Sequence, residues 1–171
     1  MNEFDLYEIL SEFREPLIEK MIESLDIKPD SRGIDLGCGI GYITNLLSKK
    51  LGINNELVGL DYSKKFIEYA KKNTENENIR FVQGDIRNLE FDSNTFDWAW
   101  SMDTLWVGPK EYGCPDEEPK KMMSELHRIL KPGGKLIFAF WSAHKFLPGF
   151  PLLEARLNAT KAANLPNTDS M

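Results

Sequence analysis

The chain has 171 residues, with 21 basic and 27 acidic side chains and a formal net charge of -6 at pH 7. This length is enough to bury a core, and we expect one domain over residues 1–171. The acidic balance argues against nucleic acid as a partner, because phosphate neutralisation by clustered lysine and arginine dominates that affinity. No run of about eighteen apolar residues is present, so no membrane span is expected. The two cysteines fall in no C-x-x-C pattern, which favours a cytoplasmic protein.

The N-terminal segment has the spacing of an amphipathic helix. Residues 4–25 place apolar side chains at intervals of three and four. Pro16 lies in the middle and is expected to divide the segment into two helices, because proline lacks an N–H donor and its ring clashes with the preceding turn. We expect residues 1–30 to form a helical cap.

Strand and helix patterns alternate from residue 33 onward. Short apolar runs predict strands over residues 33–36, 56–60, 79–82, 96–102 and 135–141. Amphipathic stretches predict helices over residues 42–51, 63–73, 116–130 and 152–163, with a tight turn at 132–134. This order indicates an α/β fold, a parallel sheet with helices on both faces and right-handed crossovers.

An alternating glycine motif joins the first strand to its helix. Residues 33–41 read Gly-Ile-Asp-Leu-Gly-Cys-Gly-Ile-Gly. A Cβ at such glycines would hold a ligand away from the backbone or forbid the required φ angles. A loop of this kind lies at the carboxyl edge of an open α/β sheet, which is where nucleotide-like ligands bind.

Three acids fall at or just beyond the ends of the first three strands. Asp35, Asp61 and Asp85 are expected at one crevice, because the strands are parallel. Asp61 lies about twenty residues beyond the glycine loop, the distance at which an acid meets a ribose. Tyr42 stands where a dinucleotide-binding loop has its third glycine, and three acids would repel a pyrophosphate. The crevice therefore suits a ligand with ribose, adenine and a cationic group.

Four motifs in order resemble class I S-adenosylmethionine-dependent methyltransferases, in particular the group similar to ubiquinone/menaquinone C-methyltransferases. The motifs lie at residues 33–41, 58–63, 84–86 and 125–134, and the resemblance covers residues 32–141. It implies a Rossmann-like doubly wound sheet of about five strands in the order 3-2-1-4-5. It also implies a cofactor-binding core over residues 31–141 and a partial acceptor-covering segment and tail over 142–171.

The resemblance implies that the cofactor is S-adenosyl-L-methionine and the product S-adenosyl-L-homocysteine. The loop residues expected around the methionine part are Gly37, Cys38, Gly39 and Gly41. Asp35 would help hold the ammonium group, and Asp61 would accept hydrogen bonds from the ribose hydroxyls. Tyr62 would pack on the adenine, Asp85 would accept from its exocyclic amine, and the Ile86 N–H would meet a ring nitrogen.

Ser101 and Met102 would line the methionine and methyl region. We assign no catalytic base and no metal site, since methyl transfer needs a base only where the acceptor must lose a proton.

The fourth strand lacks the Asn/Asp-Pro-Pro-aromatic pattern by which methyltransferases that act on exocyclic amines hold a nucleobase or a glutamine. A small-molecule acceptor is expected, and the aromatic residues at the crevice would suit an apolar ring. These aromatic residues are Trp100, Trp106, Tyr112 and Trp141.

Several of these residues have a structural alternative. Asp61 and Asp85 also fit helix-capping or turn acids, and Asp35 fits a purely structural role. Cys38 is interpreted as a small buried filler. His127 is interpreted as structural or exposed. The tryptophans of the fourth strand also fit a core, because a parallel sheet is covered on both faces.

The chain departs from the family after residue 141. Methyltransferases of this class end with a sixth and a seventh strand, and nothing after residue 141 reads as either. An exposed apolar edge on the fifth strand favours pairing with another chain, so we expect a homodimer through that edge.

The leading hypothesis for the function is methyl transfer to a small molecule. The alternatives are a catalytically silent S-adenosylmethionine-binding module or truncated fragment, and a nicotinamide-dependent oxidoreductase, which Tyr42 and Asp85 disfavour.

Overall fold

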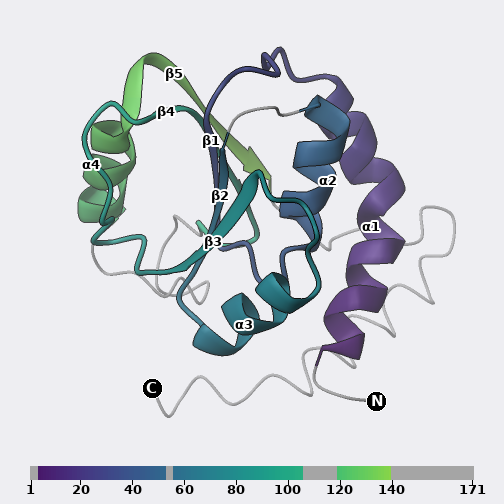
Figure 1. Cartoon of the computed structure of the whole chain (residues 1–171). Helices are drawn as coiled ribbons and strands as arrows, with labels where there is room; N and C mark the ends of the chain where they lie inside the picture. Colours follow the sequence, from purple (N-terminus) through teal and green to yellow (C-terminus); the bar gives the residue numbers. More distant parts are fainter. Residues whose placement is uncertain (1–3, 53–55, 106–118, 140–171) are drawn as a thin grey trace, which may run out of the picture. The chain divides into compact units, whose positions relative to one another are not determined.

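A five-stranded parallel sheet forms the centre of the computed structural model, which describes residues 4–52, 56–105 and 119–139 (Figure 1). The strands are β1 (Gly33–Leu36), β2 (Leu57–Asp61), β3 (Ile79–Gln83), β4 (Phe96–Met102) and β5 (Leu130–Ala139). The helices are α1 (Asp5–Glu23), α2 (Tyr42–Leu51), α3 (Lys64–Lys72) and α4 (Pro119–Ile129). The sheet order is β3-β2-β1-β4-β5 and every neighbouring pair is parallel, which confirms the predicted fold class and strand order.

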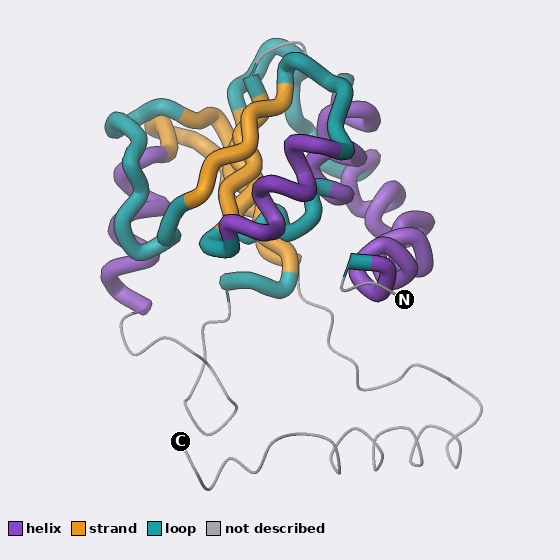
Figure 2. The backbone as a smooth tube through the Cα atoms, turned by 60° about the horizontal axis from the view of Figure 1, so that its bottom comes forward, coloured by secondary structure: helices purple, strands orange, loops and turns teal. Residues whose placement is uncertain are grey.

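Helices cover both faces of the sheet (Figures 1 and 2). On one face, α4 packs over β1, β2 and β4. The apolar side chains of that face include Ile34, Leu36, Val58, Leu60, Phe96, Met122, Leu126 and Ile129. The other face carries α1, α2 and α3, and its side chains include Ile18, Ile22, Leu46, Leu47, Trp98 and Trp100. The sheet is therefore buried between two helical layers, as the alternating pattern predicts.

Helix α1 runs unbroken through Pro16, so the predicted division into two helices is wrong. Its buried residues Ile18 and Ile22 are fully enclosed and pack against Leu47 of α2. Proline removes one helical hydrogen bond, at a cost of about 3 kcal/mol. Burial of two isoleucines, at about 1.5–3 kcal/mol each, is enough to offset that cost and keep the helix continuous.

Strand β5 begins earlier than the sequence predicts. The expected turn at residues 132–134 lies inside the strand, where the register with β4 jumps from Phe96–Leu130 to Trp98–Lys135. Gly133 has a φ of +78°, so the extra residues form an irregularity that a glycine accommodates. β5 is an edge of the described sheet, and dimerisation through it stays a prediction.

The tryptophans of β4 belong to the core. Trp98 and Trp100 are 1% and 0% exposed and pack with α1 and α2. The structural alternative is therefore correct for Trp100, which does not line a crevice. The other three aromatic residues expected there, and the helix predicted over 152–163, lie outside the described residues.

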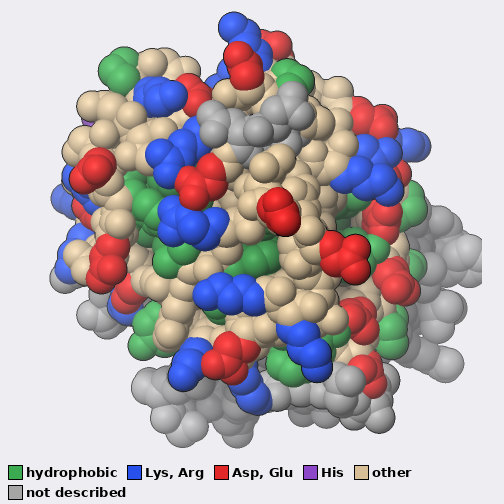
Figure 3. All heavy atoms as spheres, in the orientation of Figure 1, with side chains coloured by type: hydrophobic (Ala, Val, Ile, Leu, Met, Phe, Trp, Pro, Cys, Tyr) green, Lys and Arg blue, Asp and Glu red, His purple; other side chains and the backbone are tan. Residues whose placement is uncertain are grey.

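Basic and acidic side chains are interspersed over the face seen in Figure 3. Ion pairs between elements include Lys131 with Asp97 at 2.8 Å and Lys50 with Glu19 at 2.9 Å. Within the described part of the chain, each helix is too short or too polar to cross a membrane. All described residues belong to one compact unit over residues 1–140, and the single domain over the whole chain stays a prediction.

Candidate functional site

The glycine loop after β1 is hydrogen-bonded to the end of β2. The N–H groups of Gly37 and Cys38 both donate to the carbonyl oxygen of Leu60, at 2.7 and 3.0 Å. Gly37, Gly39 and Gly41 have φ values of +79°, +53° and +80°, a region that favours glycine. The loop conformation is therefore set by the neighbouring strand and depends on its glycines.

The three loop glycines meet different surroundings. A Cβ on Gly37 would lie 2.0 Å from Thr104 Oγ1, and a Cβ on Gly41 would lie 2.7 Å from the ring of Phe81. A Cβ on Gly39 would meet no atom within 4 Å. Gly37 and Gly41 thus permit close packing within the fold, whereas Gly39 presents its backbone to open space where a ligand can approach.

Asp61 connects the loops that follow three strands. Its carboxylate accepts from the Gly39 N–H at 2.9 Å and from the Ser63 N–H at 2.8 Å. Its carbonyl oxygen accepts from the Gly84 N–H, just after β3, at 3.0 Å. A carboxylate has about four acceptor positions, so Asp61 retains capacity for ligand hydroxyls. Ser63 caps α3, accepting from the Phe66 N–H at 3.5 Å.

Asp35 lies beneath the loop and is 2% exposed. Its carboxylate accepts a hydrogen bond from the Thr44 hydroxyl of α2 at 2.6 Å. Burial raises the pKa of Asp35 to about 7, the Thr44 hydrogen bond opposes this rise, and the charge of Asp61 adds to it. The structure gives Asp35 a partner within the fold, and its contact with an ammonium group stays a prediction.

Tyr62 is the exposed aromatic side chain beside Asp61. Its side chain is 73% exposed, so the ring is accessible to a planar base. The carbonyl oxygen of Tyr62 accepts from Gln83 Nε2 at 3.2 Å, which ties this turn to the end of β3. The position agrees with the predicted stacking, which remains a prediction.

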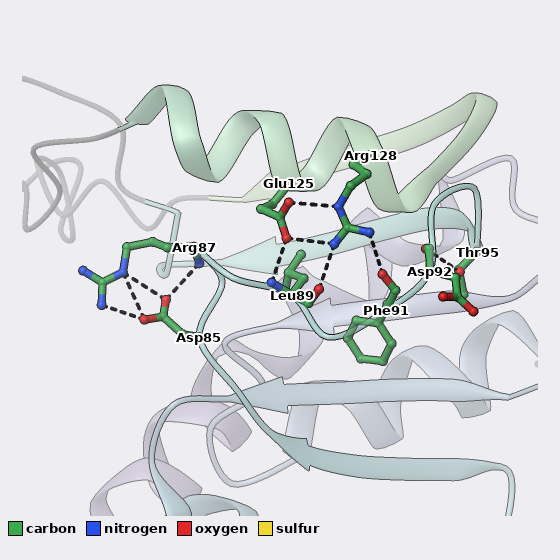
Figure 4. Close-up of polar contacts among 8 residues, drawn as sticks. All are labelled: Asp85, Arg87, Leu89, Phe91, Asp92, Thr95, Glu125 and Arg128. Atoms are coloured by element: carbon green, nitrogen blue, oxygen red, sulfur yellow. Dashed lines mark hydrogen bonds and ion pairs between the residues drawn. The ribbon is translucent and has the colours of Figure 1, made fainter.

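Asp85 forms an ion pair with Arg87 two residues further on (Figure 4). Its carboxylate accepts from the Arg87 N–H at 2.8 Å and from the guanidinium at 2.7–3.1 Å. The hydrogen bonds from Arg87 lower the pKa of Asp85 below its usual value. Ile86 packs against the apolar cluster under α4. Asp85 is therefore a charged acceptor held at the beginning of the segment after β3.

Ser101 and Met102 lie at the carboxyl end of β4, next to β1. The Ser101 hydroxyl is buried and donates to the carbonyl oxygen of Leu36 at 3.1 Å. Thr104 Oγ1 donates to the carbonyl oxygen of Met102 at 3.1 Å. These bonds hold the end of β4 beside the beginning of the glycine loop.

Cys38 and His127 have the surroundings that the structural interpretation expects. Cys38 is 6% exposed, and burial raises the pKa of its thiol, so the group stays protonated and packs as a small apolar side chain. His127 is exposed on α4. In residues 4–52, 56–105 and 119–139, His, Cys, Asp and Glu side chains form no group of three or more that fits a metal ion.

Sequence reasoning missed several residues that shape this site. Thr44 donates a hydrogen bond to Asp35, and Thr104 donates one to the Gly37 carbonyl oxygen. Arg87 forms an ion pair with Asp85. Of these contacts, only the Arg87 ion pair could have been inferred from the sequence, because a basic residue stands two positions after an acid. The Thr44 and Thr104 contacts depend on how α2 and β4 pack, which no short motif encodes.

The described residues fit a ligand with a planar base and vicinal hydroxyls. Open space adjoins Gly39, Asp61 keeps acceptor capacity, and the Tyr62 ring is accessible. A family model described as a methyltransferase domain matches residues 34–138. The chain belongs to this methyltransferase family. Its members use S-adenosyl-L-methionine, the cofactor that the resemblance implied.

Curated proteins similar in sequence to this chain are also named as methyltransferases. The demethylmenaquinone methyltransferase of Staphylococcus carnosus is 34% identical over 120 residues, which are 70% of this chain and 46% of that protein. This methyltransferase chain thus spans about half the length of the curated relatives it matches.

Solved structures share the fold. The S-adenosylmethionine-dependent methyltransferase of Aquifex aeolicus matches with a TM-score of 0.65 and 22% identity, covering 80% of this chain and 70% of that one. The cyclase SpnF matches with a TM-score of 0.59 and 25% identity, covering 71% of this chain and 42% of its own. The methyltransferase fold therefore also occurs in a protein named for a different reaction.

The buried Asp35 predicts a pH dependence of stability. Its pKa rises from 3.8 to about 7 on folding, so the folded state binds the proton more tightly. The resulting stabilisation is complete below pH 3.8 and is lost as the pH rises towards 7. Asp35→Asn removes this ionisation while keeping an acceptor for Thr44.

We expect the free energy of unfolding of Asp35→Asn to increase relative to the unsubstituted protein between about pH 4 and pH 7, and to differ by a constant amount above that range. Urea unfolding at a series of pH values measures the difference. Parallel pH profiles for the two proteins would show that Asp35 ionises normally in the fold.

Proposed function

We propose that this methyltransferase domain binds S-adenosyl-L-methionine at the carboxyl edge of its sheet and transfers the methyl group to a small-molecule acceptor. The observation that carries the proposal is the convergence of three loops on Asp61, beside the open backbone at Gly39. When bound there, the cofactor supplies a methyl group activated by a positively charged sulfur.

The residues of this chain would bind and orient the two parts of the cofactor. Asp61 would accept from the ribose hydroxyls with the acceptor positions that Gly39 and Ser63 leave open. Tyr62 would cover one face of the adenine, and Asp85 would accept from its amine in exchange for a hydrogen bond from the Arg87 guanidinium. The open backbone at Gly39 would admit the methionine part.

Acid charge at this edge favours a cationic ligand over a phosphate. Asp61 and Asp85 both lie at the loops in question, with Asp85 paired to Arg87. Asp35 lies beneath them with a pKa that burial raises to about 7, so the negative charge comes mainly from Asp61. Charge attraction between a sulfonium and these carboxylates strengthens where water is excluded. Catalysis would then rest on alignment of acceptor, methyl carbon and sulfur, because the methyl donor is already reactive.

The acceptor is proposed to be a small aromatic molecule of the quinol type. The support is the name of the relatives, demethylmenaquinone methyltransferase, and the absence from β4 of the motif that holds nucleobases or glutamine. The second candidate is a module that binds the cofactor without transferring its methyl group. Its support is that the described residues, Asp61, Gly39 and Tyr62, account for cofactor binding, while none of them is assigned a catalytic role.

Asp61→Asn is expected to weaken S-adenosyl-L-homocysteine binding about 10- to 150-fold, since a hydrogen bond to a charged group contributes about 1.5–3 kcal/mol. Isothermal titration calorimetry measures the change. The matched control is Asp97→Asn, whose carboxylate also accepts a backbone N–H, from Arg32 at 2.8 Å, but lies at the opposite end of the sheet. Equal affinities of the two variants would remove Asp61 from the site.

Transfer of an isotope-labelled methyl group separates the two candidate functions. The protein is incubated with methyl-labelled cofactor and either a demethylated menaquinol analogue or a cell metabolite extract. Methyl transfer predicts label in an organic product and stoichiometric S-adenosyl-L-homocysteine. Cofactor binding with no labelled product from either source would favour the silent module.

A further inference from the structure

The segment after β3 has little regular structure of its own. Residues 84–95 join β3 to β4 with only an isolated bridge between Asp85 and Asn88. Leu89 within it is 4% exposed and belongs to the apolar core. Backbone N–H and C=O groups buried in such a segment need partners from elsewhere, because leaving them unpaired is costly. What supplies these partners also determines where Asp85 and Ile86 lie.

Arg128 of α4 supplies partners for two carbonyl groups of this segment (Figure 4). Its Nη2 donates to the Leu89 carbonyl oxygen at 2.7 Å, and its Nη1 donates to the Phe91 carbonyl oxygen at 2.6 Å. Its Nε and Nη2 donate to the two carboxylate oxygens of Glu125 at 2.9 and 2.8 Å. Four of the five guanidinium N–H donors are thus engaged, a geometry that lysine does not reproduce.

Glu125, about one helical turn before Arg128 on α4, binds the same segment through the Leu89 N–H. Its Oε2 accepts from the Leu89 N–H at 2.8 Å, so both polar groups of the Leu89 backbone are bound to α4. The hydrogen bonds from Arg128 lower the pKa of Glu125 to about 2, with the Leu89 N–H contributing. Glu125 therefore remains charged over the whole physiological pH range.

The helix that carries these side chains is itself fixed on the sheet. Met122, Leu126 and Ile129 form its buried stripe at 5%, 0% and 0% exposure. Glu125 and Arg128 occupy the adjoining positions, which face the segment after β3 in Figure 4. The carbonyl oxygen of Arg128 also accepts from the Asn94 N–H at 2.9 Å. The contact therefore joins the segment to a rigid element.

We propose that Arg128 and Glu125 are positioning residues for the adenine subsite. By binding Leu89 and Phe91, they fix the segment whose first residues, Asp85 and Ile86, are expected at the adenine. This inference rests on the proposed function. It also gives a role to the motif at residues 125–134, to which the sequence resemblance assigned none.

Arg128→Lys is the variant that tests the contact, because it keeps the charge and removes the forked geometry. Arg32→Lys is the matched control. Arg32 forms an ion pair with Glu56 at the amino end of the sheet, and its side chain is 35% exposed, against 33% for Arg128. Both variants keep the positive charge of a half-buried ion pair, which Arg32 forms through Nη2 alone, but only Arg128 donates to the backbone of the segment after β3.

Hydrogen exchange in the ligand-free protein tests the first step. We expect Arg128→Lys to accelerate exchange in peptides that contain residues 85–91, while Arg32→Lys leaves those peptides unchanged. Equal protection of these peptides in the unsubstituted protein and in Arg128→Lys would overturn the inference, whatever the protein binds.

Ligand discrimination tests the second step. S-inosyl-L-homocysteine carries an oxygen where S-adenosyl-L-homocysteine has the exocyclic amine, so Asp85 should favour the adenosyl ligand by about tenfold, the contribution of one hydrogen bond. We expect calorimetry to show that Arg128→Lys loses most of this preference and that Arg32→Lys retains it.

A purely structural role of Arg128 would weaken the binding of both ligands equally. An unchanged preference in Arg128→Lys would overturn the inference alone. Failure of the unsubstituted protein to bind either ligand would instead overturn the proposed function and with it the inference.

Discussion

The attachment of the glycine loop to the end of β2 is the constraint on which the candidate site depends. β1 and β2 are parallel neighbours in register, with Leu36 opposite Leu60, so the loops after them begin side by side. The Leu60 carbonyl oxygen accepts two N–H groups of the loop, and the Asp61 carboxylate accepts a third. Because the carbonyl oxygen of Asp61 also accepts from Gly84, one residue joins the loops that follow three strands.

The layers around this junction hold it from both faces of the sheet. On one face, the Tyr42 hydroxyl at the beginning of α2 donates to Glu15 of α1, so α1 is connected directly to the helix that leaves the glycine loop. On the other face, Arg128 and Glu125 connect α4 to the segment after β3. The residues expected at the cofactor are therefore connected to α1 and α4, neither of which carries a residue that the sequence predicted at the methionine part or the adenosine.

The sequence predicted the sheet and the approach of Asp61 to the glycine loop because both depend on local patterns, whereas cofactor binding by these residues stays a prediction. Buried parallel strands read as short apolar runs, and the spacing from the glycine loop to Asp61 follows from one strand–helix–strand unit. The continuous helix through Pro16 was missed because its stability comes from core packing of Ile18 and Ile22. The Thr44 partner of Asp35 was missed for a similar reason, since it depends on the approach of α2 to β1.

The central claim is that the site binds the methyl-donor cofactor and not a dinucleotide. Separate titrations with one ligand of each kind test this claim most directly. The unsubstituted protein is titrated by calorimetry with S-adenosyl-L-homocysteine and, separately, with NAD. The Asp61 carboxylate against the glycine loop and Tyr42 at the first position of α2 predict binding of S-adenosyl-L-homocysteine and no binding of NAD. Binding of NAD without binding of S-adenosyl-L-homocysteine would contradict the account.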